Sequence, residues 1–314
     1  MRKTKLALIG LMSYLPLMNR YFNKRGGNTS SARYCYSVWL RHLVLARQNL
    51  HLDGCPKIIA ELGPGYSLGT GLAALISGCD QYYAFDVVNY ANLGTNLSIF
   101  DELVDLFNKR EDIPGQDEFP EIRPTLSNYV FPHNILSSEH MSHALEEFRI
   151  SRIRNSINKP SAAGSVITYK APWHDSNVIE KQSVDMIYSQ AVLEHVADLT
   201  SAYYAMKSWL KPTGFISNQI DFRCHGTADE WNGHWAISDF MWRLIRGSTP
   251  SLLNREPHSK HIDILAKLGF RVISDIVEKS PSTLTRADLA PRFRMIKVGD
   301  LTTSGAFIQA TLVT

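Results

Sequence analysis

The chain of 314 residues has few cysteines, no internal repeat and no long apolar run. Its four cysteines are Cys35, Cys55, Cys79 and Cys224. They are too widely separated for a metal-ligand spacing or a disulfide framework, so we expect them to be reduced thiols in a cytoplasmic protein. No stretch has the roughly 20 apolar residues of a membrane-spanning helix. These absences exclude a disulfide scaffold and a bundle of spanning helices, and they leave an ordinary globular protein.

Acidic residues are absent from residues 1 to 50, which contain nine Lys or Arg. The remaining residues carry 24 basic and 30 acidic side chains, so the net charge of +3 conceals an acidic main part. This excess of acidic residues and the lack of a recognisable nucleic-acid-binding motif argue against a nucleic-acid partner.

The basic amino-terminal segment opens with an apolar stretch, residues 6 to 18, behind Arg2, Lys3 and Lys5. A secretory signal would need a small-residue cleavage site, and Asn19-Arg20-Tyr21-Phe22 follows instead. Two interpretations remain. Residues 1 to 25 either form a helix that caps the catalytic domain, which we favour, or touch an anionic membrane surface from the cytoplasmic side. Residues 31 to 50 predict a packed helix, so the whole of residues 1 to 50 is expected to be helical.

The most informative stretch is residues 58 to 65, an apolar strand with an acid near its end and a turn through two glycines. The acid is Glu61, and the glycines are Gly63 and Gly65. The apolar run at residues 72 to 76 then has helical character. A glycine turn between strand and helix lets the backbone approach a ligand closely.

A second strand, residues 81 to 86, ends on Asp86, at the separation from Gly63 where an acid meets a ribose diol in nucleotide-binding units. A dinucleotide fingerprint starting at Gly63 would need its third glycine at Leu68. Glu61 would also repel a pyrophosphate and attract a cationic amino group. A nicotinamide-dependent oxidoreductase therefore remains only as an alternative.

Glu61-Leu62-Gly63-Pro64-Gly65 resembles motif I of the class I S-adenosylmethionine-dependent methyltransferases, and residues 191 to 196, with Leu-Glu-His, resemble the segment after the fourth strand of that family. The resemblance implies S-adenosylmethionine as cofactor. In the family the glycine turn wraps the methionine part, the second acid binds the ribose, and residues after the third strand flank the adenine. The implied cofactor-binding residues are Glu61, Gly63, Pro64, Gly65, Asp86, Ala171, Pro172, Trp173, Gln190 and Ala191.

Later apolar segments complete such a sheet, and they fall at residues 165–171, 184–190, 215–221, 270–273 and 306–312. With intervening helical patterns they predict an α/β fold, a doubly wound, Rossmann-like sheet of seven strands with one crevice at the strand carboxyl ends. We expect one methyltransferase domain over residues 51–314, with insertions at 87–164 and 222–261. The first insertion is either a lid over the crevice, which we favour, or structural filling.

The second insertion contains Trp231, Trp235 and Trp242, interleaved with Asn232 and His234. Aromatic faces beside polar donors suit a sugar ring, although buried core tryptophans are equally compatible. Arg255 could hold an anionic group of the substrate or form a surface pair with Glu256. The candidate substrate-binding residues are Trp231, His234, Trp235 and Arg255.

Methylation of a hydroxyl needs a base, and Asp221 and His225 stand at the end of the fifth strand. We expect His225 to be the base and Asp221 to orient it or bind the substrate, with His195 as second candidate; each could instead stabilise its loop. The histidines show no metal-ligand spacing, so we expect no metal. Residues 34–40 and 218–222 extend the resemblance to bacterial methyltransferase-domain proteins of surface-polysaccharide synthesis. A sugar or small-molecule O-methyltransferase is the expected function, with a non-catalytic cofactor-binding scaffold as a further alternative.

Overall fold

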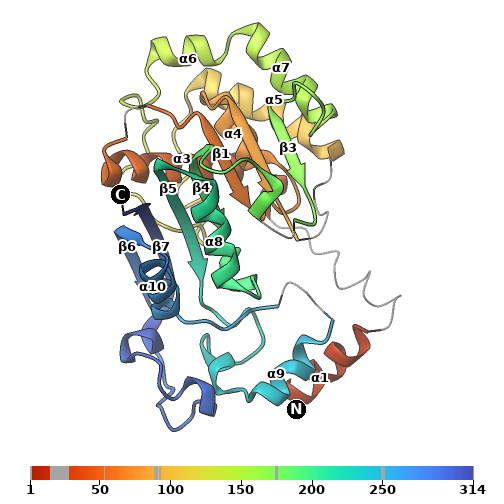
Figure 1. Ribbon diagram of the computed structural model, residues 1–314, viewed down its shortest axis with the longest axis vertical. Helices are drawn as coiled ribbons and strands as arrows, with labels where there is room; N and C mark the ends of the chain where they lie inside the picture. Colours follow the sequence, from red (N-terminus) through yellow and green to blue (C-terminus); the bar gives the residue numbers. More distant parts are fainter. Residues whose placement is uncertain are drawn as a thin grey trace.

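The computed structural model describes residues 2–14, 28–52, 54–87, 91, 93–173, 176–248 and 252–313. Seven strands form one sheet in the order β3-β2-β1-β4-β5-β7-β6 (Figure 1). The first five run parallel, and β7 is antiparallel to both of its neighbours. The strands are β1 (Ile58–Leu62), β2 (Gln81–Phe85), β3 (Ile167–Lys170), β4 (Val184–Gln190), β5 (Leu210–Asp221), β6 (Phe270–Lys279) and β7 (Thr303–Leu312).

Helices cover both faces of the sheet because its central strands are apolar on both sides. On β1, Ile59 faces one core cluster, while Ala60 and Leu62 face the other. One layer contains α3 (Ala32–Leu50), α4 (Gly69–Ile76), α5 (Leu93–Lys109), α6 (Ser138–Ala144) and α7 (Glu147–Asn158). The other contains α8 (Leu199–Trp209) and α10 (His258–Lys267). This is the doubly wound sheet that the sequence predicts.

Two local boundaries differ from the sequence-based expectation. The helical pattern of residues 141–158 belongs to two helices, because the chain turns at Leu145 and Glu146 before α7 begins. The fifth strand begins earlier than the predicted residue 215, because β5 starts at Leu210 and includes Lys211-Pro212-Thr213-Gly214. Val184 pairs with Leu210 and Met186 pairs with Phe215, so these four residues form an irregularity within the strand.

All four cysteines are free and buried. Cys55 and Cys79 precede β1 and β2, and the pairing of these strands brings their sulfur atoms to 3.5 Å. The sequence gives no sign of this proximity, because 24 residues separate the two positions.

The helix α1 (Arg2–Met12) packs against α9 (Asp239–Arg246) of the second insertion, at the far end of the molecule from α6 and α7 (Figure 1). The described part of the segment, residues 2–14, thus lies against the second insertion. Residues 15–27, which include part of the segment predicted to dock, lie outside the described residues. Of the helices that the structure describes, none is long and apolar enough to cross a membrane.

Candidate functional site

The strand order places four turns side by side at the carboxyl edge of the sheet, after β3, β2, β1 and β4. Every residue that the resemblance assigns to the cofactor belongs to one of these turns or to the strand end before it. Residues more than a hundred positions apart in sequence are thereby brought to one edge, where doubly wound sheets bind their ligands.

The glycine turn after β1 is tight and closely packed. Gly63 (φ 67°) donates its amide to the Phe85 carbonyl at 2.8 Å, and a Cβ there would lie 2.6 Å from the Val192 side chain. Gly65 also has a positive φ, 75°, and a Cβ there would lie 3.3 Å from Thr29 Oγ1. Both positions therefore require glycine, and the segment just before α3 lies against this turn.

Glu61 points into the core beneath the turn, and the Tyr82 hydroxyl donates to its Oε2. Burial raises the pKa of Glu61 to about 8, although hydrogen bonds from Tyr82 and Tyr188 favour the ionised form. A cationic amino group bound above the turn would favour ionisation further. Glu61 can thus become ionised when a cationic amino group binds, such as that of the methionine part of the cofactor.

Asp86 and the turn after β3 are tied together. The Asp86 amide donates to the Lys170 carbonyl at 3.0 Å, and the Asp86 carbonyl accepts from the Trp173 amide at 3.1 Å. The Trp173 ring packs 6.1 Å from Phe85 and 5.4 Å from Trp209. An acid for a ribose diol thus lies next to a flat ring and the Ala171-Pro172 turn, and this donor set fits a nucleoside.

Gln190 ends β4 within a buried hydrogen-bond chain. Gln190 Oε1 lies 3.2 Å from His42 Nε2, and Gln190 Nε2 donates to the Arg123 carbonyl at 3.1 Å. The other ring nitrogen of His42, Nδ1, lies 2.8 Å from Ser217 Oγ. Burial lowers the pKa of His42 to about 4. Ala191 follows with a positive φ of 54° and donates to the Gln219 carbonyl at 3.0 Å. The Arg123 contact shows that the first insertion reaches this edge.

Residues 113–129 of the first insertion form a strap that links α3 to the sheet edge. Buried Arg41 on α3 donates to the carbonyls of Pro114 (3.1 Å) and Pro124 (2.6 Å). At the other end Arg123 pairs with Glu278 of β6, its Nε 2.9 Å from Oε1. The helices α5, α6 and α7 cover the sheet, whereas this strap lies at the sheet edge, where a lid is predicted. Sequence reasoning missed Arg41 and Arg123, because neither belongs to a motif.

Asp221 and His225 form a pair at the end of β5, with His225 Nε2 3.2 Å from Asp221 Oδ2. Both side chains are partly accessible, and His225 has a positive φ of 45°. Burial would raise the pKa of Asp221, but hydrogen bonds from His225 and from the Arg223 amide lower it below its usual range. A carboxylate that stays ionised can orient the imidazole. Strained backbone at a reactive side chain is also common at functional sites.

The segment after β4 contributes Glu194 and His195 to the same place. The His195 ring lies 5.3 Å from the His225 ring. Burial raises the pKa of Glu194 well above its usual range, and the charge of Asp221 raises it further, against the opposing effect of backbone amides. Asn254 of the second insertion holds this segment. Its side-chain Nδ2 donates to the Leu193 carbonyl at 2.7 Å, and its backbone N–H donates to the Glu194 carbonyl at 2.7 Å.

The tryptophan-rich segment is mostly packed inside the second insertion. Trp235 is buried and donates its Nε1 to the Arg255 carbonyl at 2.9 Å, whereas Trp231 is half-buried. The Arg255 guanidinium is buried, pairs with Asp239 at 2.6 Å and stacks 4.5 Å above the Trp242 ring. These contacts hold the insertion together. Burial, with the charges of Arg255 and His225, lowers the pKa of His234 to about 3, so its imidazole is neutral.

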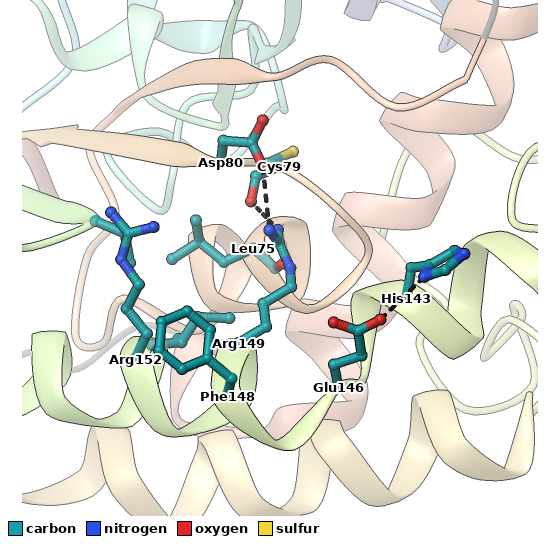
Figure 2. Close-up of a pocket in the computed structure, with 10 residues that line it drawn as sticks. Leu75, Cys79, Asp80, His143, Glu146, Phe148, Arg149 and Arg152 are labelled. Carbon is teal, nitrogen blue, oxygen red and sulfur yellow. Dashed lines mark hydrogen bonds and ion pairs between the residues drawn. The ribbon is translucent and has the colours of Figure 1, made fainter.

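A cavity of about 250 Å³ lies at the opposite, amino end of β2 and β3, between α4 and α7 (Figure 2). Arg149 crosses it and donates to the Leu75 carbonyl and to Asp80, each at 3.0 Å. The cavity contains none of the residues predicted from sequence for binding or catalysis. Among the residues described, no group of three or more His, Cys, Asp or Glu side chains could hold a metal ion.

Comparison with known proteins gives a family match and distant structural similarity. A family model described as a methyltransferase domain matches residues 142–217. No curated protein matches the sequence. Solved structures with a similar arrangement include an S-adenosylmethionine dependent methyltransferase from Mesorhizobium loti (TM-score 0.42, 15% identity, covering 85% of this chain and 96% of that one). Another is phosphoethanolamine N-methyltransferase 2 from Haemonchus contortus (TM-score 0.43, 15% identity, covering 88% and 53%), so this chain spans about half the length of that enzyme.

The family match and the strand order support one conclusion. Parallel strands 3-2-1-4-5 followed by an antiparallel strand 7 inserted before strand 6 are the sheet of class I methyltransferases. The chain therefore carries a methyltransferase domain, with S-adenosylmethionine as its cofactor. This match favours a methyltransferase over the nicotinamide-dependent oxidoreductase.

Proposed function

We propose that the protein methylates a hydroxyl group of a sugar or another small polar acceptor, of the kind used in surface-polysaccharide synthesis. The observation that carries the proposal is the Asp221–His225 pair, whose 3.2 Å contact lies at the end of β5, next to the turn after β4. An amine needs no strong base, whereas a hydroxyl must lose its proton during attack.

The proposed roles follow from the contacts of each side chain. When bound, the cofactor supplies an electrophilic methyl group on a sulfonium. His225 takes the acceptor proton at Nδ1, because Nε2 faces Asp221, which orients the ring and stabilises its charged form. His195 is the second candidate base. Half-buried Trp231 forms one wall of the acceptor pocket, and the buried residues His234, Trp235 and Arg255 hold that wall in place.

The test is methyl transfer from labelled S-adenosylmethionine to sugars and to a cell polysaccharide extract. An ether resists alkali, a methyl ester does not, and an N-methyl product separates from both by mass and charge. The proposal expects alkali-stable label on a sugar hydroxyl. Label found only on an amine or a carboxylate contradicts it.

We also propose that the protein works in the cytoplasm and touches the inner membrane surface peripherally through residues 1–25. The free state of all four cysteines and the acid-free basic amino terminus support this proposal.

A further inference from the structure

The outward side of α1 carries large apolar side chains that nothing in the described structure covers. Leu8 is 57% exposed, Leu11 48% and Met12 43%, and Tyr14 just after the helix is 65% exposed. Lys5 is exposed on the same side of the helix. Together these five residues are the α1 face. Exposed apolar residues scattered singly are ordinary, but four within seven positions mark an interaction surface.

The opposite side of α1 is fixed on α9 by small residues. Ala7, Gly10 and Ser13 are buried there, and a Cβ on Gly10 would lie 2.0 Å from the Leu244 carbonyl oxygen. Ser248 Oγ donates to the Ser13 carbonyl at 2.6 Å. The helix cannot rotate without losing this close contact, so the α1 face points away from the protein.

The charges on α1 and α9 indicate which kind of surface the α1 face would bind. The helix contains basic residues and no acid, and residues 1 to 50 contain none either. On α9, Arg243 is exposed, and it forms no ion pair with any described residue. The one acid of α9, Asp239, is paired with Arg255 at 2.6 Å. Apolar side chains beside uncompensated cations fit the headgroup boundary of an anionic bilayer.

The same helix pair is connected to the candidate acceptor site. Ala7 of α1 belongs to one cluster with Trp242 and Ile245 of α9. The Arg255 guanidinium stacks on the Trp242 ring and donates to the His234 carbonyl at 3.3 Å. The Trp231 carbonyl of the same insertion accepts from the amide of Cys224, the residue before His225, at 2.6 Å. One insertion therefore joins the α1 face to the catalytic side of the sheet.

We propose that the α1 face docks on an anionic lipid surface and holds the second insertion there, so that the methyl acceptor is one carried by lipid. The choice of acceptor rests on the proposed hydroxyl methylation, whereas the docking does not. The α1 face then acts as the contact that brings the enzyme to its substrate.

Docking is tested by flotation of the purified full chain with vesicles of phosphatidylcholine, with or without phosphatidylglycerol. We expect flotation only with the anionic vesicles, weaker at high salt. The double variant Leu8→Glu/Leu11→Glu should lose it by at least about tenfold, because two charges enter the apolar face. Phe148→Glu on α7 is the matched control, since Phe148 is 80% exposed but distant from α1, and it should float like the wild type.

Several results would overturn docking: no flotation, equal flotation without phosphatidylglycerol, or a double variant that floats normally while binding S-adenosylmethionine. Self-association in sedimentation that the double variant abolishes, without flotation, would assign the face to a second copy of the chain. The acceptor is tested with labelled cofactor and a membrane extract. Label extracted with lipid supports the proposal, and label only on free sugars overturns the lipid-borne acceptor but leaves hydroxyl methylation intact.

Discussion

Arg41 Nη1 donates to the carbonyl oxygen of Pro124 at 2.6 Å, although 83 residues separate the two positions. The same guanidinium holds the Pro114 carbonyl at 3.1 Å. One buried cation on α3 thus holds the strap at two points, Pro114 and Pro124. The strap is shaped by a residue outside the insertion, and this dependence can be tested.

Arg41→Met should destabilise the protein by about 3 kcal/mol, because each buried carbonyl left without a donor costs about 1–3 kcal/mol. Urea unfolding measures the total, and hydrogen exchange should show faster opening of residues 113–129. Arg33→Met is the control. Its pair with Glu118 is solvent-exposed on both sides, so the loss should be below about 1 kcal/mol. Equal effects of the two changes would show that the strap does not depend on Arg41.

Gly65→Val should abolish S-adenosylmethionine binding, because a side chain would fill the turn and force an L-residue into a positive φ of 75°. Gly54→Val separates these causes, since Gly54 has a positive φ of 81° with no atom within 4 Å of its Cβ position. Calorimetry should find loss of binding only in the first variant, and no binding of NAD to the wild type. Comparable cofactor affinity in both variants would mean that the turn does not hold the cofactor.

Three buried histidines predict loss of stability in acid. Burial lowers the pKa of His42 to about 4 and of His234 and His261 to about 3. In the unfolded chain each takes up a proton near pH 6.5, so the free energy of unfolding falls as pH drops from about 6.5 toward 4. Glu61 acts in the opposite direction, because its raised pKa favours the folded state at low pH.

Urea unfolding at pH 7 and pH 5 measures this dependence. In His261→Gln the free energy of unfolding should fall less between pH 7 and pH 5 than in the wild type, because one histidine contribution is removed while those of Glu61 and Glu194 remain. His143→Gln is the control, because that side chain is 73% exposed, and it should leave the pH dependence unchanged. A pH dependence in His261→Gln equal to that of the wild type would contradict the assignment of a neutral, buried His261.

The fold was predictable because its signals are local. The strands are short apolar runs, and Gly63, Gly65 and Asp86 follow two of them at positions that a nucleotide site requires. The strand order then brings the predicted cofactor residues together. This part of the candidate site depends only on the sheet.

The rest of the site depends on contacts between distant segments, which a single sequence does not encode in a readable form. Arg255 reads as a surface residue beside Glu256, yet it is buried between Trp242 and Phe293. Asn254 is inconspicuous in sequence, yet it holds the Leu-Glu-His segment. The mixture of tryptophans with polar residues suits a sugar site and a small core equally, and packing alone determines that Trp235 lies inside.

The role of His225 as general base is tested by the turnover number of His225→Ala in the methyl-transfer assay. S-adenosylmethionine affinity is measured on the same sample. Removal of a general base costs about a hundredfold to ten-thousandfold in rate. If His225 is the general base, His225→Ala should lose kcat on that scale with unchanged S-adenosylmethionine affinity. His195→Ala should instead weaken S-adenosylmethionine binding. Near wild-type turnover in His225→Ala, together with inactive His195→Ala, would contradict the role of His225 as general base.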